Sequence, residues 1–290
     1  MPCIEFKDVS KSLSGNVLLN SISFSIQEGE IVALFGIPES SAAQVIAIAS
    51  GISGPDKGTV RVMGISPGES QRGGMTYSLL GSDRFPAYLT PMNFISLCSK
   101  HYNFDRAAAK QALRYAGLWN SRNLKFDLLS DSEKQQLCIA PLLCATPSAV
   151  LIDSFFPLSG MRARELFGEA FSKLSSAKTT FLISSDSFAN VRDMASRVIL
   201  LKAGSVVYDV QVRDLLSGEG RSETRIRVSD VVAATALVPD ARVERDCLVL
   251  GEGNGRLGPV ITLLEESGIS VISVEKGSSL FGLIPGVFER

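Results

Sequence analysis

The sequence lacks most of the residues from which catalytic and metal centres are commonly built. Among its 290 residues there is one histidine, His101, so we expect no histidine-based metal site or catalytic triad within the chain. His101 stands in a polar and aromatic stretch, which favours an ordinary helix residue. The 5 cysteines are scattered, odd in number and without C-x-x-C spacing, which predicts reduced thiols rather than disulfides or a zinc site.

An excess of basic charge and long hydrophobic runs are also missing. Lys and Arg number 29 and Asp and Glu 30, a net charge of -1, so a nucleic-acid partner is not expected. The longest apolar runs, such as IVALF at 31–35, are far too short to cross a bilayer, and the charged N-terminal stretch does not resemble a secretory signal. We therefore expect a cytoplasmic protein that is either soluble or bound to a membrane only through a partner.

What is present is an alternation of short apolar runs with helical stretches, which predicts an α/β domain. Hydrophobic residues make up 45% and charged residues 20%, enough for a sizeable core. Alternating residues near 3–11 and 20–30 predict half-exposed antiparallel strands. Further strands are expected at 58–64, 149–153 and 179–185, helices at 93–102, 105–118, 131–145, 161–176 and 187–196, and a hairpin at 197–209.

A small polar stretch at 217–223 predicts a linker between two domains. Residues 1–216 would form the larger domain, with a helical subdomain at about 82–143. Residues 224–290 alternate strand and helix patterns in a compact way, which predicts a small α+β domain.

The segment at 31–51 has the layout of a phosphate-binding loop, because an apolar strand runs into a glycine, a polar loop and a helix. The usual text of such a loop is G-x-x-x-x-G-K-[ST]. Gly36 matches the first glycine. Ser41 stands at the second glycine, Ala42 at the lysine and Ala43 at the hydroxyl that binds Mg²⁺. We therefore expect that the loop does not grip the β- and γ-phosphates of ATP in the usual way.

Five segments in order resemble the ATP-binding subunit of an ABC transporter, over residue 4 to about residue 209. They are the approach to the phosphate loop (19–36), the segment after its helix (50–64), the signature region running into the Walker B strand (128–153), the switch strand and the closing hairpin. The resemblance implies a P-loop NTPase-like fold with a mixed sheet core, an antiparallel β subdomain and a helical subdomain. The tail resembles the C-terminal domain of daunorubicin-resistance-type ATPases, which serve ABC-2 permeases.

The resemblance also assigns the positions of an ATP site, and most of them carry the wrong chemistry. The adenine-stacking aromatic falls on Leu13, the Q-loop glutamine on Gly81 and the switch histidine on Ser185. The Walker B aspartate is present as Asp153, whereas Ser154, a poor base, replaces the glutamate that activates water. Losing a positioned general base costs ~10²–10⁴ in rate. We expect a pseudo-ATPase with a vestigial site.

The signature motif LSGGQ is degenerate as well. Its five positions read Leu129, Ser130, Asp131, Ser132 and Glu133. Two carboxylates, Asp131 and Glu133, stand where the γ-phosphate of a neighbouring subunit would dock, so we expect this surface to repel ATP.

Two hypotheses concern the emptied phosphate loop, residues 36–44, which ends at Gln44. The first is that Glu39, Ser40 or Ser41 caps the following helix and fills the anion site; the alternative is a solvated loop. The second is that Asp153 bonds only to the loop. No cofactor and no metal are expected, and ATP and Mg²⁺ would bind only if the degenerate pocket still accepts them.

In ABC transporter ATPases, the membrane subunit docks on the region that follows the Q-loop, and the resemblance implies the same for this chain. Here that region carries an aromatic and Met cluster, which suits a partner groove: Phe85, Tyr88, Leu89 and Met92. The alternative is that these side chains only pack the helical subdomain.

Three functions remain open. The first is a non-hydrolysing subunit that docks on an ABC-2-type permease and pairs with an active ATPase subunit, or with itself. The others are an active transport ATPase, and a soluble regulator on an ABC scaffold.

Overall fold

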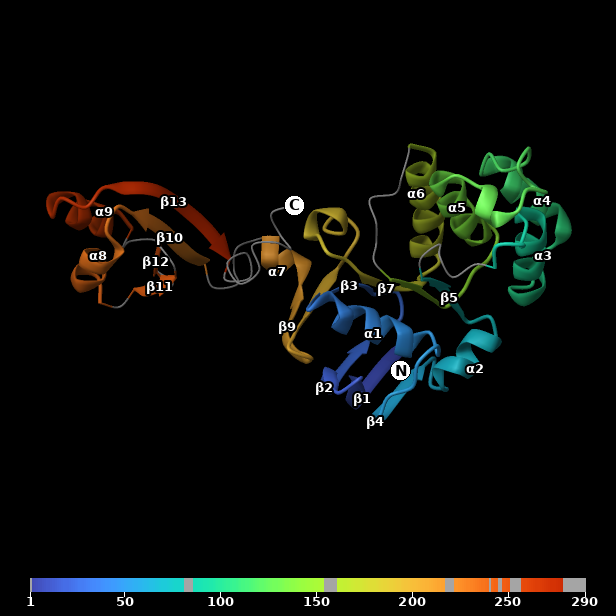
Figure 1. Cartoon of the computed structure of the whole chain (residues 1–290), viewed down its shortest axis with the longest axis horizontal. Coiled ribbons are helices and arrows are strands. Elements are labelled where there is room, and N and C mark those ends of the chain that lie inside the picture. Colours follow the sequence, from blue (N-terminus) through green and yellow to red (C-terminus); the bar gives the residue numbers. More distant parts are fainter. Residues whose placement is uncertain are drawn as a thin grey trace. The chain divides into compact units, whose positions relative to one another are not determined.

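The computed structural model describes residues 2–80, 86–153, 161–216, 222–239, 241–244, 247–250 and 257–278. The chain forms two compact units, Met1–Asp209 and Val210–Arg290 (Figure 1). Most of the linker predicted at 217–223 lies outside the described residues.

An antiparallel sheet begins the first unit, with the strand order β2-β1-β4. Its strands are β1 (Ile4–Leu13), β2 (Asn16–Ile26) and β4 (Lys57–Val62). Ser14 and Gly15 both have positive φ, which gives the β1–β2 hairpin a two-residue turn. The alternation of the sequence therefore forms the half-buried sheet that it predicts.

A six-stranded sheet with the order β5-β6-β7-β3-β8-β9 forms the centre of the first unit. Its strands are β3 (Ile31–Ile37), β5 (Thr76–Leu79), β6 (Ala149–Ile152), β7 (Thr180–Ser184), β8 (Arg197–Lys202) and β9 (Ser205–Gln211). The first five are parallel. The turn into β9 falls at Ala203 and Gly204, both with positive φ, which confirms the predicted hairpin.

Helices cover this sheet and build a helical subdomain (Figure 1). They are α1 (Glu39–Ala49), α2 (Pro67–Arg72), α3 (Pro91–His101), α4 (Arg106–Tyr115), α5 (Asp131–Ile139) and α6 (Met161–Ser176). The Asp105 carboxylate caps α4 by accepting from the Ala108 amide at 2.6 Å, and Gly117 follows the helix with a φ of 76°. His101 is the last residue of α3, as expected. The mixed α/β fold is confirmed.

Two helix predictions differ from the structure. The helix expected at 131–145 stops at Ile139 and continues as a 3₁₀ turn, Ala140–Leu143, because Pro141 has no amide to donate. The helix expected at 187–196 is wrong, since only a 3₁₀ turn, Phe188–Asn190, forms there. Ser187 is extended and bonds to the Ser185 hydroxyl, and such local bonds compete with a helix.

The second unit contains an antiparallel sheet with the order β11-β12-β10-β13. Its elements are α7 (Val212–Leu216), β10 (Ser222–Val228), α8 (Val231–Leu237), β11 (Arg242–Glu244), β12 (Cys247–Leu250), α9 (Leu257–Glu266) and β13 (Val271–Ser278). Ile226 and Leu248 of the sheet share a core with Ala234 of α8 and Leu264 of α9.

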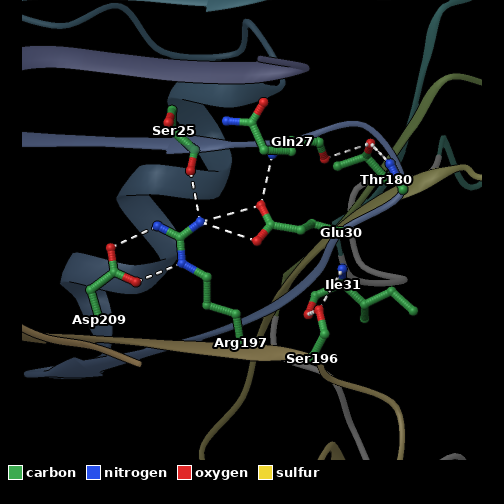
Figure 2. A network of polar contacts seen from close by, with 9 residues as sticks. Ser25, Gln27, Glu30, Ile31, Thr180, Ser196, Arg197 and Asp209 are labelled. Atoms are coloured by element: carbon green, nitrogen blue, oxygen red, sulfur yellow. Dashed lines mark hydrogen bonds and ion pairs between the residues drawn. The ribbon is translucent and has the colours of Figure 1, made fainter. Parts of the chain in front are cut away.

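One ion-pair network fastens the two sheets of the first unit together (Figure 2). The guanidinium of Arg197 on β8 donates two hydrogen bonds to the Asp209 carboxylate on β9, at 2.5 and 2.7 Å. It also donates to the Ser25 carbonyl on β2 at 2.8 Å and contacts Glu30, just before β3, at 3.2 Å. Glu30 in turn accepts from the Gln27 amide at 2.7 Å. One side chain therefore joins β2, β8, β9 and the entry to β3.

Cys3, Cys98, Cys138 and Cys144 are free thiols, in line with the expectation. Burial raises the pKa of Cys98 and of Cys138 to about 12 each, which makes them poor nucleophiles. Throughout the part of the chain that the structure describes, no helix has the length and apolar character needed to cross a membrane.

Candidate nucleotide site

The phosphate-loop segment, residues 36–44, runs from the end of β3 into α1, and its start is closed by bonds from the first turn of the helix. The Ser41 side chain is fully buried, and its hydroxyl donates to the Pro38 carbonyl at 2.8 Å. The Ser41 amide donates to the same carbonyl at 3.0 Å. A Cβ on Gly36 would lie 2.6 Å from the Ser41 hydroxyl and 2.7 Å from the Ala42 amide nitrogen, so only glycine fits at this position. The loop has the outline of a phosphate cradle, but a serine hydroxyl lies inside it.

The capping hypothesis for this loop is wrong. The N-cap of α1 is Pro38, which has no side-chain cap, and Ser41 uses its hydroxyl on a carbonyl rather than on an amide. Glu39 and Ser40 are exposed. Gln44 turns to the far end of the helix, where its amide donates to the Ser53 hydroxyl at 3.0 Å. The loop therefore contributes no side chain as a substitute anion.

Ala42 and Ala43 bring no polar group to the site. Ala42 is buried in the core with an exposed fraction of 3%, and Ala43 is half-buried. A hydrogen bond to a charged group contributes about 1.5–3 kcal/mol. The missing lysine and hydroxyl would each have supplied contacts of that kind to a triphosphate.

Asp153 lies directly after β6 and bonds across to the neighbouring strand. It accepts a hydrogen bond from the Ser184 hydroxyl at 2.9 Å, where β6 and β7 run in parallel register with Ile152 opposite Ile183. This partner differs from the emptied loop that the sequence suggested. Ser154, at the position of the general base, lies outside the described residues.

The remaining catalytic positions hold small or apolar groups. The Ser185 side chain is buried, and its hydroxyl donates to the Ser187 carbonyl at 2.9 Å, within its own turn. Leu13, at the adenine position, lies at the end of a hairpin with 60% of its surface exposed. Gly81, at the Q-loop position, lies outside the described residues.

The N-terminus of α5, where the degenerate signature lies, is occupied by Glu133. Its carboxylate accepts from the Ser130 amide at 3.0 Å and from the Ser130 hydroxyl at 2.8 Å, while the Ser130 hydroxyl accepts from the Glu133 amide. This is a capping box. The Ser121 hydroxyl adds a bond of 2.6 Å, and it is the main reason that the pKa of Glu133 lies below its ordinary value, followed by the Ser130 amide.

The other signature residues are arranged around this cap. Leu129 is buried with an exposed fraction of 4%. Asp131 is exposed and pairs with Lys134 at 3.4 Å, and the Ser132 hydroxyl accepts from the Gln136 amide at 3.1 Å. Of the two carboxylates, Asp131 is therefore exposed, whereas Glu133 is bound by Ser130 and Ser121.

Three of the four residues predicted to dock a membrane partner lie in the described part of the chain, just before α3 or in its first turn. Tyr88 is 74% exposed, whereas Leu89 and Met92 are half-buried. Sequence reasoning missed Leu124 and Leu128, whose exposed fractions are 45% and 66%. Leu124 stands between Asn123 and Lys125, which was the available signal, whereas Leu128 is followed by Leu129 and carried no such signal.

Both leucines belong to a segment that is hydrogen-bonded to Leu89, because the Phe126 amide donates to the Leu89 carbonyl at 2.8 Å. Phe85 lies outside the described residues.

Comparisons with known proteins agree with this architecture. Residues 19–156 match the ABC transporter family. The chain is 22% identical over 224 residues to the Nod factor export ATP-binding protein I of Rhizobium etli (strain ATCC 51251), covering 74% of this chain and 70% of that one. It is 25% identical over 244 residues to the L-cystine transport system ATP-binding protein TcyN of Escherichia coli (strain K12), covering 78% and 96%.

Solved structures share the fold. An ATP-binding subunit of an ABC transporter superposes with a TM-score of 0.65 at 20% identity, covering 75% of this chain and 93% of that one. The dimeric ATP-binding cassette MJ0796, bound to ADP and Pi, superposes with a TM-score of 0.63 at 21% identity, covering 72% and 99%.

Proposed function

Because the chain contains an ABC transporter ATP-binding domain, matched over residues 19–156, we propose that it serves a transport complex as a subunit that does not hydrolyse ATP. It docks on an ABC-2-type permease at the cytoplasmic face of the membrane. It pairs there with a second ABC ATPase subunit, which is either an active partner or another copy of this chain.

The observation that carries the proposal is the closed phosphate loop. The fully buried Ser41 hydroxyl lies against the Pro38 carbonyl at 2.8 Å, on the inner side of the turn that starts at Gly36. A phosphate needs consecutive amides that point at it and a cation close by. Here one amide already donates to a carbonyl, and Ala42 stands where the cation belongs.

The chemistry around the loop supports the same conclusion. The one retained acid, Asp153, is engaged by Ser184, and Ser185 turns its hydroxyl into its own loop. In-line phosphoryl transfer needs a metal held by a hydroxyl and an aspartate, and a residue that orients the water. This chain has the aspartate without the other two.

A thermal unfolding experiment with Mg-ATP tests the loss of nucleotide binding. Binding at a hundredfold excess over Kd stabilises a protein by about 2.7 kcal/mol. We expect no change in Tm for the natural chain at millimolar Mg-ATP. A Tm that rises with Mg-ATP concentration would contradict the proposal.

The triple variant Ser41→Gly, Ala42→Lys, Ala43→Ser is the matched comparison, since it removes the buried hydroxyl and returns the cation and the metal ligand. We expect Mg-ATP to stabilise this variant. Its own Tm without nucleotide shows whether it folds.

Membrane capture tests the docking part of the proposal. Tagged full-length chain is mixed with detergent-solubilised membranes from its own source, and the retained integral membrane proteins are identified. We expect Tyr88→Ala to lower recovery of a permease severalfold. Val17→Ala, at an apolar position 60% exposed on β2, is the control and should leave recovery unchanged. Equal recovery with both variants would remove Tyr88 from the docking surface.

A further inference from the structure

One segment of the helical subdomain carries basic charge only. Residues 106–126 contain five of the 29 basic residues of the chain and none of its 30 acidic ones, although the whole chain has a net charge of -1. The acidic residues that border the segment are Asp105, whose carboxylate caps α4, and Asp127. Positive charge is therefore concentrated in one short part of an otherwise balanced protein.

Three of the basic residues form a row along α4, because Arg106, Lys110 and Arg114 are spaced four residues apart. Side chains at this spacing are neighbours on a helix, about 5–6 Å apart, and like charges there destabilise it. Arg106 and Arg114 are exposed, and Lys110 is half-buried. The helix therefore keeps two repulsive neighbour pairs on a surface that water and ligands can reach.

The positive charge extends beyond the helix through Trp119. The Arg114 guanidinium lies 4.1 Å from the centroid of the Trp119 ring and the Arg122 guanidinium 4.6 Å from it, so the two cations are no farther apart than the sum of these distances. Arg122 also donates to the Trp119 carbonyl at 2.6 Å. Cation–π attraction holds both guanidiniums in place without neutralising them. We call Arg106, Lys110, Arg114 and Arg122 the basic stripe.

The basic stripe differs from other basic side chains of the first unit, which are paired with acids. Lys11 contacts Asp56 at 2.7 Å, and Arg197 contacts both Asp209 and Glu30. Within the described part of the chain, no carboxylate contacts any member of the stripe. The stripe is therefore suited to a ligand that brings negative charge from outside the chain.

An anionic bilayer surface fits the stripe. Four or more Lys and Arg residues on an amphipathic helix are typical of contact with anionic lipid headgroups, and α4 is amphipathic, since it buries Ala109, Ala112 and Leu113. A nucleic acid fits less well, because the net charge of the whole chain is -1.

The surroundings of the stripe favour lipid over an acidic protein. Leu124 and Leu128, which are 45% and 66% exposed, follow Arg122 along the chain, and exposed apolar side chains beside cations suit a bilayer interface. The Met92 amide donates to the Arg122 carbonyl at 3.0 Å, so the stripe ends beside a residue predicted to dock on a permease. That this end is turned to the membrane rests on the proposed function, whereas the charge of the stripe does not.

We propose that the basic stripe, together with Leu124 and Leu128, binds the anionic headgroups of a phospholipid bilayer. The Lys and Arg side chains contact lipid phosphates, and the leucines enter the boundary between headgroups and acyl chains. The chain then has a direct contact with lipid in addition to any contact with a permease.

Flotation of the full chain with protein-free vesicles tests this binding. The vesicles contain phosphatidylcholine with about one-third phosphatidylglycerol, and vesicles of phosphatidylcholine alone are the neutral comparison. We expect the chain to float with the anionic vesicles only, and to float less at high salt, because salt screens exposed charges. No binding to the anionic vesicles at low salt would overturn the proposal.

The triple variant Arg106→Gln, Lys110→Gln, Arg114→Gln removes the row on α4. One basic residue near an anionic surface contributes roughly a factor of five in affinity, so binding should fall by more than about tenfold. Loss of the like-charge pairs should leave the Tm unchanged or higher. The double variant without the change at Arg114 keeps the contacts of Trp119 and should still lower binding severalfold, which covers the case of a triple variant that folds poorly.

The matched control is the triple variant Lys57→Gln, Lys202→Gln, Arg192→Gln. It removes the same charge at exposed positions of the first unit outside the stripe, and it should keep most of the binding. Equal losses in the two triple variants would mean that net charge alone attracts the lipid, and the proposal would fall.

Membrane capture in detergent separates a lipid from an acidic protein as the source of the negative charge. A stripe variant that floats like the natural chain but no longer recovers a permease would show that the stripe binds protein, which contradicts the proposal. Because the vesicles contain no protein, failed flotation leaves the proposed function standing. Flotation without recovery of any permease would in turn leave lipid binding standing.

Discussion

Replacing Arg197 by methionine tests the network that joins the sheets of the first unit. Methionine keeps an unbranched apolar stem but removes every donor. The Arg197 side chain is 15% exposed, and its partners Glu30 and Asp209 are 21% and 34% exposed, so the three groups are largely withdrawn from water. The variant therefore leaves two carboxylates close together without their cation.

The expected loss of stability follows from these contacts. Breaking a buried pair costs about 3–5 kcal/mol, whereas exposed pairs contribute about 0–1 kcal/mol. Because Asp209 is about one-third exposed, we expect an intermediate value of about 2–4 kcal/mol. A domain of this size loses roughly 2–4 °C of Tm per kcal/mol. The Tm of the first unit should therefore fall by roughly 5–15 °C.

Urea unfolding followed by Trp119 emission measures this loss in the first unit, which contains the only tryptophan. Arg192→Met is the matched control, because Arg192 pairs with the adjacent Asp193 at 3.2 Å with side chains 57% and 85% exposed. The control should change the free energy of unfolding by less than about 0.5 kcal/mol. Equal effects of the two substitutions would refute the reasoning from burial.

Two further predictions concern the site itself. Gly36→Ala should lower the free energy of unfolding by more than about 1 kcal/mol, because the added Cβ would meet the Ser41 hydroxyl and the Ala42 amide. Gly168→Ala, in open space on α6, should raise the free energy of unfolding by about 0.5–1 kcal/mol. Chemical denaturation compares the two variants, and a Gly36→Ala variant as stable as the natural chain would mean that the loop is open. Because hydrogen bonds hold the pKa of folded Glu133 below its ordinary value, its stabilisation is present above the unfolded-state pKa of about 4.3 and is lost as the pH falls through the folded pKa. Glu133→Gln should therefore show a smaller loss of Tm than the natural chain between neutral and acid pH, and parallel Tm–pH curves would contradict this.

The sequence predicts the elements of this fold where the local pattern and the tertiary environment agree. The β1–β2 alternation, the Asp105 cap and the turn at Ala203 and Gly204 are all properties of short segments. The helix expected at 187–196 does not form because the Ser185 hydroxyl bonds to the amide and the carbonyl of Ser187, a local pairing that periodicity does not reveal.

The sequence predicted which residues occupy the positions of the site, but not which hydrogen bonds these residues make. Spacing places Ser41 in the phosphate loop, but its bond to Pro38 depends on the path of the turn. The bond between Ser121 and Glu133 spans 12 residues, and that between Ser184 and Asp153 spans 31. Neither pairing has a sequence signal, because each arises from how separate segments meet in the folded chain.

Asp209 is also the residue at which the first unit ends along the chain. A force applied to the second unit therefore acts on the first unit through β9, which Arg197 binds with two hydrogen bonds to Asp209. Those bonds hold the C-terminal end of β9 to β8, and the same guanidinium passes the strain on to β2 through the Ser25 carbonyl. The Arg197 contacts therefore distribute a force on the C-terminal part of the chain over both sheets, which opposes separation of the β8–β9 hairpin.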